Sequence, residues 1–135
     1  MEKLELRIVT PHQEVLAQQV DEVVLPSTVG SMGVLAGHAP LLAQLDVGEV
    51  SYRIGRERRF LAVSGGFAEV LADSVSILAR SCETAEDIDL ERARQAELRA
   101  REALKREIGS GEFLKAEVKL KRAITRISTH GRGRV

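Results

Sequence analysis

The stretch Glu83-Thr84-Ala85-Glu86-Asp87-Ile88-Asp89-Leu90-Glu91-Arg92-Ala93 separates two parts of the chain that differ in periodicity. Apolar residues recur at every second position before it, as in strands, and at every third or fourth position after it, as in helices. Asp87 or Asp89 can accept hydrogen bonds from the free amides of a helix's first turn, and negative charge is favourable there. We therefore predict a sheet domain over residues 1–84 and a helical domain over residues 85–135.

The motif Ile88-Asp89-x-x-Arg92-Ala93 suggests a second role for this stretch. A purine needs an apolar surface and an acceptor for its exocyclic amine, while phosphates need forked cations, which Arg supplies better than Lys. The spacing fits equally an ordinary Asp–Arg pair on one helix face, at positions i and i+3. Spacing alone leaves both readings open.

The composition is that of one domain, or of a small domain with an appendage, because the 135 residues are 44% hydrophobic and can fill one modest core. The formal net charge of +0 hides an asymmetry. Residues 1–84 hold 7 Lys and Arg against 11 Asp and Glu, whereas residues 85–135 hold 13 against 9. The two parts have opposite net charges and could attract each other.

Several chemistries find no support in the sequence. Cys82 is the single cysteine, so there is no disulfide framework or CxxC motif. The three histidines lie far apart without metal-ligand spacing, and neither a Walker loop nor a nucleophile elbow is present. The uncharged run from Val23 to Leu45 contains prolines and glycines that would break a spanning helix. We expect a cytosolic, non-catalytic protein without a signal peptide.

Short alternating segments fill the first 84 residues. Turn signals at Gly48, Gly55-Arg56, Gly65-Gly66 and Asp73-Ser74 recur roughly every ten residues, which is typical of a small antiparallel sandwich or barrel. The sheet domain is therefore expected to be all antiparallel.

A helical hairpin is predicted after the junction, with helices over about residues 88–108 and 112–129. Gly109-Ser110-Gly111 should stop the first helix and force an antiparallel return. Small side chains bury little surface, so the hairpin should be weakly held. Residues 131–135 have no apolar period, and we expect them to be disordered. The predicted seam consists of Ala93, Ala96, Ala100, Ala103, Leu104 and Ile108 on the first helix and Ala116, Leu120, Ala123 and Ile127 on the second.

The second helix is strongly basic. A basic amphipathic helix can bind nucleic acid, an anionic membrane or an acidic partner helix, or can simply be a solvated face. No interleaved aromatic residues support nucleic acid. The basic residues are Lys115, Lys119, Lys121, Arg122 and Arg126.

Three motifs in this order resemble the epsilon subunit of the bacterial F-type ATP synthase. They are Gly30-Ser31-Met32-Gly33-Val34-Leu35-Ala36-Gly37-His38-Ala39-Pro40-Leu41, Val63-Ser64-Gly65-Gly66-Phe67-Ala68-Glu69-Val70, and Asp87-Ile88-Asp89-x-x-Arg92-Ala93. The resemblance covers essentially the whole chain. It implies an α+β fold, in which an N-terminal β-sandwich of about ten antiparallel strands precedes a C-terminal two-helix hairpin.

The resemblance also implies partners and a location. The subunit is a non-catalytic part of the rotor, bound to the gamma subunit and resting on the c-subunit ring at the cytoplasmic face of the cell membrane. We place ring contacts at Ser31, Met32 and His38. The hairpin would extend into the alpha/beta catalytic head and block ATP hydrolysis, with Lys115, Lys119, Lys121, Arg122 and Arg126 facing an acidic segment of the beta subunit.

Some family members bind ATP as a regulatory ligand on the folded-down hairpin, which holds it in the non-inhibitory state. The resemblance leaves open whether magnesium accompanies the ATP. Two alternatives remain: a structural coupling subunit without nucleotide sensing, and a free basic-helix protein that binds nucleic acid. The positions that match the ATP-binding members are Glu83, Ile88, Asp89, Arg92, Ala93, Arg99, Arg122 and Arg126.

Overall fold

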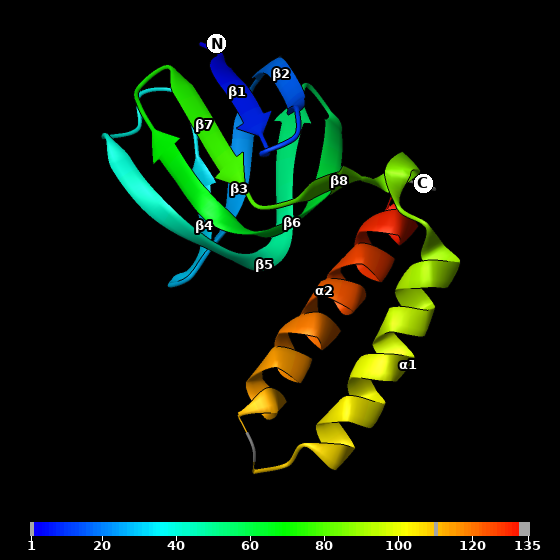
Figure 1. Cartoon of the computed structure of the whole chain (residues 1–135). Coiled ribbons are helices and arrows are strands. Elements are labelled where there is room, and N and C mark those ends of the chain that lie inside the picture. Colours follow the sequence, from blue (N-terminus) through cyan, green and yellow to red (C-terminus); the bar gives the residue numbers. More distant parts are fainter. Residues whose placement is uncertain (1, 110, 133–135) are drawn as a thin grey trace.

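The computed structural model describes residues 2–109 and 111–132. Within these residues the chain forms a strand-rich domain followed by two long helices (Figure 1). The strands are β1 (Leu4–Val9), β2 (Glu14–Val20), β3 (Glu22–Ser27), β4 (Gly30–Val34), β5 (Leu41–Ile54), β6 (Glu57–Val70), β7 (Ser74–Ala79) and β8 (Cys82–Thr84). The helical elements are the 3-10 turn η1 (Ala85–Asp87), α1 (Leu90–Arg106) and α2 (Glu112–Arg132).

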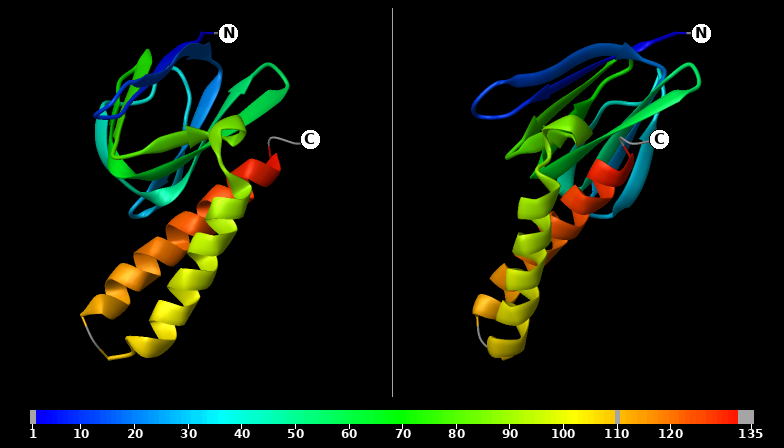
Figure 2. Two further views of the ribbon diagram at one scale, coloured as in Figure 1. Left: turned by 45° about the vertical axis from the view of Figure 1, so that its right-hand side comes forward. Right: turned by 90° about the vertical axis from the view of Figure 1, so that its right-hand side faces the viewer.

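Two strands of 14 residues each, β5 and β6, form the centre of the strand domain. The hydrogen-bonded order is β2-β1-β7-β6-β5-β3-β4, and β8 also pairs with β6. Residues 61–63 of β6 pair with β8, whereas residues 66–70 pair with β7. Because β6 changes partner along its length, the sheet folds over on itself into a sandwich (Figure 2).

The change of partner occurs at two glycines of β6. Gly65 and Gly66 have φ of +77° and +129°, a region that L side chains rarely adopt. A Cβ atom on Gly66 would lie 2.1 Å from the carbonyl oxygen of Leu78 on β7. The glycines therefore let β6 bend while its backbone lies close against β7.

The structure corrects two details of the predicted sheet. Gly48 and Gly65-Gly66 were predicted to be turns, but they lie inside the continuous strands β5 and β6, so the described residues form eight strands rather than ten. The number of about ten strands was what the resemblance implied. The all-antiparallel prediction also fails for one pair, because β1 and β7 run parallel from Glu5↔Ser74 to Val9↔Leu78. Alternation of apolar residues carries no information on strand direction.

The core lies between the two layers and is aliphatic. The alternating burial of β1 is the clearest case, with Leu4, Leu6 and Ile8 fully buried and Glu5 and Arg7 exposed. Burying each such aliphatic side chain contributes about 1.5–3 kcal/mol, so the buried faces of the strands account for much of the stability of the domain. The other fully buried side chains of the core are Val20, Val23, Leu25, Val34, Val50, Ala68, Val70, Val75 and Ile77.

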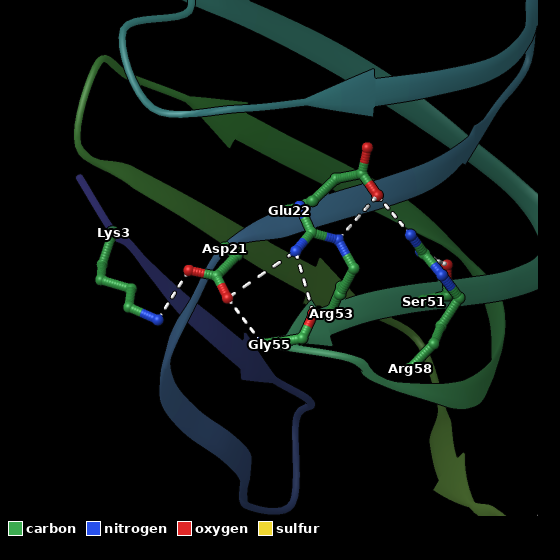
Figure 3. Close-up of polar contacts among 7 residues, drawn as sticks. All are labelled: Lys3, Asp21, Glu22, Ser51, Arg53, Gly55 and Arg58. Atoms are coloured by element: carbon green, nitrogen blue, oxygen red, sulfur yellow. Dashed lines mark hydrogen bonds and ion pairs between the residues drawn. The ribbon is translucent and has the colours of Figure 1, made fainter. Parts of the chain in front are cut away.

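An ion-pair network on one end of the sandwich ties the N-terminus to the β5–β6 turn (Figure 3). Asp21 accepts from Lys3 Nζ at 2.6 Å and from the Gly55 amide at 2.6 Å. These two hydrogen bonds, with the Lys3 bond as the larger cause, hold the pKa of Asp21 below its ordinary value. The network positions a turn and contains no candidate catalytic group. Its other members are Glu22, Ser51, Arg53 and Arg58.

The junction folds much as predicted, with a shift of two residues. Ile88 is extended and 5% exposed, and α1 begins at Leu90 instead of residue 88. Of the two candidate caps, Asp89 is the N-cap, because its carboxylate accepts from the Arg92 amide at 3.1 Å. The first helix ends at Arg106, before the predicted residue 108.

The hairpin closes along its alanines. Ala93 and Ala100 of α1 and Ala116 and Ala123 of α2 are all buried, which confirms the centre of the predicted seam. Ile108 does not extend it, because this residue follows the end of α1 and is 75% exposed. The second helix continues to Arg132, three residues beyond the predicted end, so Gly131 and Arg132 are helical; the rest of the predicted disordered tail lies outside the described residues.

The hairpin is joined to the sandwich through α2. The C-terminal half of α2 packs against β5 and β6, and α1 packs on α2 (Figures 1 and 2). The N-terminal half of α2 and all of α1 extend beyond the sandwich. The contact between the two domains is therefore one half of one helix.

Candidate functional site

A cavity of about 380 Å³ lies between α2 and the strands β6 and β8. Residues of β6 and β8 and the intervening Ser81 line one side, and residues of α2 line the other. Three of the predicted ATP-binding residues line it: Glu83, Arg122 and Arg126. The remaining lining residues are Ala62, Val63, Ser64, Ser81 and Thr125.

An ion pair at this cavity joins Arg126 to Glu83. The Nε atom of Arg126 lies 2.6 Å from Oε1 of Glu83, and Nη2 donates to Oε2 at 2.9 Å. Both side chains are about one-third exposed, so water screens the pair only in part. The neighbouring thiol of Cys82 has its pKa raised to about 12 by burial and by the charge of Glu83, and is therefore neutral at physiological pH.

Three of the predicted ATP-binding residues lie at the junction between the two domains. The Asp89 carboxylate caps α1, Ile88 is buried under the junction, and Ala93 is fully buried. The side chains of Ile88 and Ala93 are thus packed within the protein. The Asp89 side chain is exposed and keeps a carboxylate oxygen that the cap hydrogen bond does not use.

The two predicted arginines of α1 do not line the cavity. Arg92 and Arg99 are exposed, and their separation of seven residues places them on one face of the helix. Within residues 2–109 and 111–132, no carboxylate lies within ion-pair distance of Arg92, Arg99 or Arg122. The structure thus gathers Glu83, Arg122 and Arg126, and leaves Arg92 and Arg99 outside that group.

The basic face of α2 is partly bonded to the sandwich. Lys121 Nζ lies 2.7 Å from Oδ2 of Asp46, and Arg126 is paired with Glu83. Lys115 pairs at 3.3 Å with Glu112 of its own helix. The other two predicted beta-subunit contacts, Lys119 and Arg122, are exposed.

The predicted ring contacts lie at or beside the edge strand β4. Ser31 is exposed, and Met32 is half-buried against the core. His38 follows in the loop, where its Nδ1 lies 2.7 Å from the carbonyl oxygen of Ala39. Val29, at the tip of the β3–β4 turn, is 96% exposed.

Sequence reasoning missed the acceptors for α2. Asp46 and Glu49 of β5 bind side chains of α2, and no motif marks either residue. The only signal was the opposite net charge of the two parts, which predicts attraction but not the atoms involved. A second cavity, of about 490 Å³, was also unforeseen; it lies near the end of α2, where Arg132 stacks over Phe60 with 4.3 Å to the ring centroid.

Two kinds of site were searched for in the part of the chain that the structure describes. It contains no group of three or more His, Cys, Asp and Glu side chains that could hold a metal ion. In the same part, neither helix combines the length and the apolar character needed to cross a bilayer.

Comparison with known proteins gives one consistent result. Residues 3–85 match the beta-sandwich domain of the ATP synthase delta/epsilon chain, and residues 86–131 match the long alpha-helix domain of the same chain. An ATP synthase epsilon chain of Syntrophobacter fumaroxidans is 47% identical over 93% of this chain and 94% of its own. ATP synthase epsilon chain 2 of Syntrophotalea carbinolica is 46% identical over 98% of this chain and 96% of its own.

Solved structures agree with these matches. A chain in the OSCP/F1/c-ring structure of the Euglena gracilis mitochondrial ATP synthase superposes with a TM-score of 0.80 at 25% identity. That match covers 93% of this chain and 79% of the other. A chain of the central stalk/c-ring structure of the Tetrahymena thermophila mitochondrial ATP synthase has the same fold, with a TM-score of 0.61 at 18% identity. The chain therefore belongs to the family of ATP synthase epsilon chains, as the resemblance of its three motifs implied.

Proposed function

We propose that this chain joins the gamma subunit to the c-subunit ring in the central stalk of a proton-translocating ATP synthase, and that its C-terminal helices inhibit ATP hydrolysis. In this proposal ATP binding favours the folded-down, non-inhibitory hairpin. The epsilon chains of this family are non-catalytic subunits, so the proposed role is coupling and regulation. The single observation that supports the regulatory part is the closed hairpin, docked on the sandwich by one half of α2.

The stalk assignment draws on the relatives and on the fold. The relatives of high coverage are named ATP synthase epsilon chains, and the structure from Euglena gracilis contains the c-ring. The proposed ring contacts, Ser31, Met32 and His38, lie at or near the edge strand β4, remote in sequence from the helices. Such a separation would let one domain stay on the ring while the other moves.

The charge of the hairpin suits an inhibitory contact with an acidic segment of the catalytic head. Lys119 and Arg122 are exposed, while Lys121 and Arg126 are bonded to sandwich carboxylates. Because ion pairs of exposed groups are exchanged at low cost, these side chains could transfer from the sandwich to another acidic surface. The inhibition should weaken as salt is raised.

The donor set suits a triphosphate. Arg92, Arg99 and Arg122 have no carboxylate partner within the described ranges, so the hairpin carries uncompensated guanidinium groups, the forked donors that phosphates prefer. Glu83 supplies an acceptor, and Ile88, Asp89 and Ala93 lie where the first helix begins. We propose these seven residues and Arg126 as the nucleotide-binding set. Arg122 and Arg126 of α2 and Arg92 and Arg99 of α1 would bind the phosphates.

Regulation would follow from linkage. A ligand that binds only the closed hairpin stabilises it by about 2.7 kcal/mol when it exceeds its Kd a hundredfold. A hairpin seam built from alanines is weak enough for such a term to decide between the closed and extended forms. Abundant ATP would keep the hairpin down, and ATP depletion would release it to stop wasteful hydrolysis.

One observation favours the alternative of a structural subunit without nucleotide sensing. Arg92 and Arg99 do not line the cavity that Glu83, Arg122 and Arg126 share. In this alternative the arginines of α1 only contact partner subunits.

Titration of the isolated chain with ATP, with and without magnesium, tests the proposal. Nucleotide sensing predicts saturable shifts of the amide signals of residues 83–126, and Arg92→Ala and Arg126→Ala should abolish them. Arg56→Ala, which changes an exposed arginine of the β5–β6 turn, is the matched control. Undiminished ATP affinity in both variants would leave only the structural role.

A further inference from the structure

Three carboxylates of the sandwich bind the C-terminal half of α2. Asp46 and Glu49 belong to β5, and Glu83 belongs to β8. Asp46 accepts from Lys121 at 2.7 Å, and Glu83 accepts from Arg126. Both donors are side chains of α2, and so are the donors to Glu49.

Glu49 has the most donors of the three. Thr129 Oγ1 donates to its Oε2 at 2.9 Å, and Arg132 Nε lies 3.1 Å from Oε1 and 2.9 Å from Oε2. The Ser128 hydroxyl lies 3.5 Å from Oε1. Arg132 is held in place a second time, because its guanidinium stacks on the ring of Phe60.

Glu49 is also the least exposed of the three carboxylates. The side chain of Glu49 is 19% exposed, against 29% for Glu83 and 46% for Asp46. Thr129 is fully buried, and its hydroxyl donates to the Glu49 carboxylate. A charged hydrogen bond that is shielded from solvent contributes more than an exposed ion pair.

Three of the donors lie on one face of α2. Lys121, Ser128 and Arg132 are separated by seven and four residues, close to two turns and one turn, and Thr129 lies beside them, three residues before Arg132. Lys121 and Arg126 are also among the residues proposed to contact an acidic segment of the catalytic head. In the docked hairpin, these two side chains already form ion pairs with Asp46 and Glu83 of the sandwich.

We propose that Glu49, by binding Thr129 and Arg132, is the main latch that holds α2 on the sandwich without nucleotide, and that Asp46, Glu49 and Glu83 compete with the acidic partner for the basic face of α2. The latch itself needs no partner. The competition rests on the proposed function, because it assumes an inhibitory contact with the head.

Hydrogen exchange of the full chain, in the absence of nucleotide, tests the latch. Glu49→Gln should raise the exchange rates of the α2 amides over residues 120–132 by about tenfold, because the carboxylate is lost while the side chain keeps its size. Glu14→Gln is the matched control, since Glu14 is an exposed residue of the sandwich strand β2 and pairs with Arg7 of β1. Unchanged exchange in β1 and β7 would show that the sandwich itself is intact.

A second variant approaches the contact from the helix. Thr129→Val keeps the shape of a buried side chain and removes the donor, so it should raise the same exchange rates. In the double variant the two effects should be less than multiplicative, because both remove one interaction. Exchange over residues 120–132 that is unchanged in both single variants would overturn the latch.

The competition has its own test. In a reconstituted complex with the catalytic head, Glu49→Gln should inhibit ATP hydrolysis severalfold more strongly than the wild type, and the control Glu14→Gln should not. Equal inhibition would overturn the competition. The outcome of the ATP titration is separate from these tests. A chain that shows the latch but no response to ATP would support the latch and contradict nucleotide sensing.

Discussion

Arg126 of α2 and Glu83 of β8 form a two-point ion pair, with Nε 2.6 Å from Oε1 and Nη2 2.9 Å from Oε2. The pair joins the last helix to the last strand, across 43 residues of sequence. It also lies at the cavity proposed to take part in nucleotide binding. Docking of the hairpin and nucleotide binding therefore share a residue pair, and a change to either member should alter both.

The first prediction concerns this pair. Glu83→Gln and Arg126→Gln should each weaken the docking of α2 by about 1 kcal/mol, the scale of a partly exposed ion pair. The double variant should lose less than the sum of the two, because the interaction is removed only once. Opening free energies from amide exchange in α2 measure the coupling. Strictly additive losses would mean that the two side chains stabilise docking separately.

The second prediction concerns the start of α1. Asp89→Ala should destabilise the hairpin by about 1 kcal/mol, because the N-cap carboxylate accepts from the Arg92 amide. Asp87→Ala is the control: Asp87 lies in the preceding 3-10 turn and does not cap α1. Exchange rates of the first-turn amides of α1 measure the difference. Similar effects of the two substitutions would show that charge near the helix end, and not the cap, stabilises α1.

Local chemistry was enough to predict the junction and the seam. A helix cap depends on residues three apart, such as Asp89 and Arg92, and a helix seam depends on the spacing of apolar residues along one helix. Both can therefore be recognised in a short segment of sequence. The bend of β6 was mistaken for a turn for the same reason. Gly65-Gly66 has turn chemistry, but the pairing of β6 with β5 on one side and with β7 and β8 on the other keeps the strand continuous.

Contacts between distant residues could not be read from the sequence. The parallel pairing of β1 with β7 joins segments about 70 residues apart, and strand direction leaves no trace in the alternation of apolar residues. Glu49 and Thr129 are 80 residues apart, and each alone resembles an ordinary surface residue. The site is likewise predictable only in part: Glu83, Arg122 and Arg126 meet through docking, which no local pattern describes.

The third prediction concerns the bend of β6. Gly66→Ala should destabilise the sandwich by about 3 kcal/mol or more, because φ is +129° and the new Cβ would meet the Leu78 carbonyl oxygen at 2.1 Å. Gly33→Ala is the control, since a Cβ at Gly33 meets no atom within 4 Å. Urea denaturation compares the two. A loss below 1 kcal/mol in Gly66→Ala would show that β6 and β7 separate easily at this point.

The fourth prediction concerns acid stability. Hydrogen bonds from Lys3 and from the Gly55 amide lower the pKa of Asp21 from its ordinary value of 3.8. A carboxylate whose pKa is lower in the folded state stabilises the protein above its unfolded pKa, and this contribution is lost as the pH falls through the folded pKa. Asp21→Asn should therefore reduce stability by a constant amount between pH 7 and about pH 5, and by progressively less below pH 4.

Urea denaturation at several pH values measures this dependence, and Glu5→Gln is the control because Glu5 is an exposed residue of the neighbouring strand β1. The reasoning depends on the geometry at the β5–β6 turn. The Gly55 amide is 34 residues from Asp21 in sequence, so the unfolded chain cannot form that hydrogen bond reliably. A stability difference between Asp21→Asn and the wild type that stays the same down to pH 3 would mean that the turn is held by packing and not by the charge of Asp21.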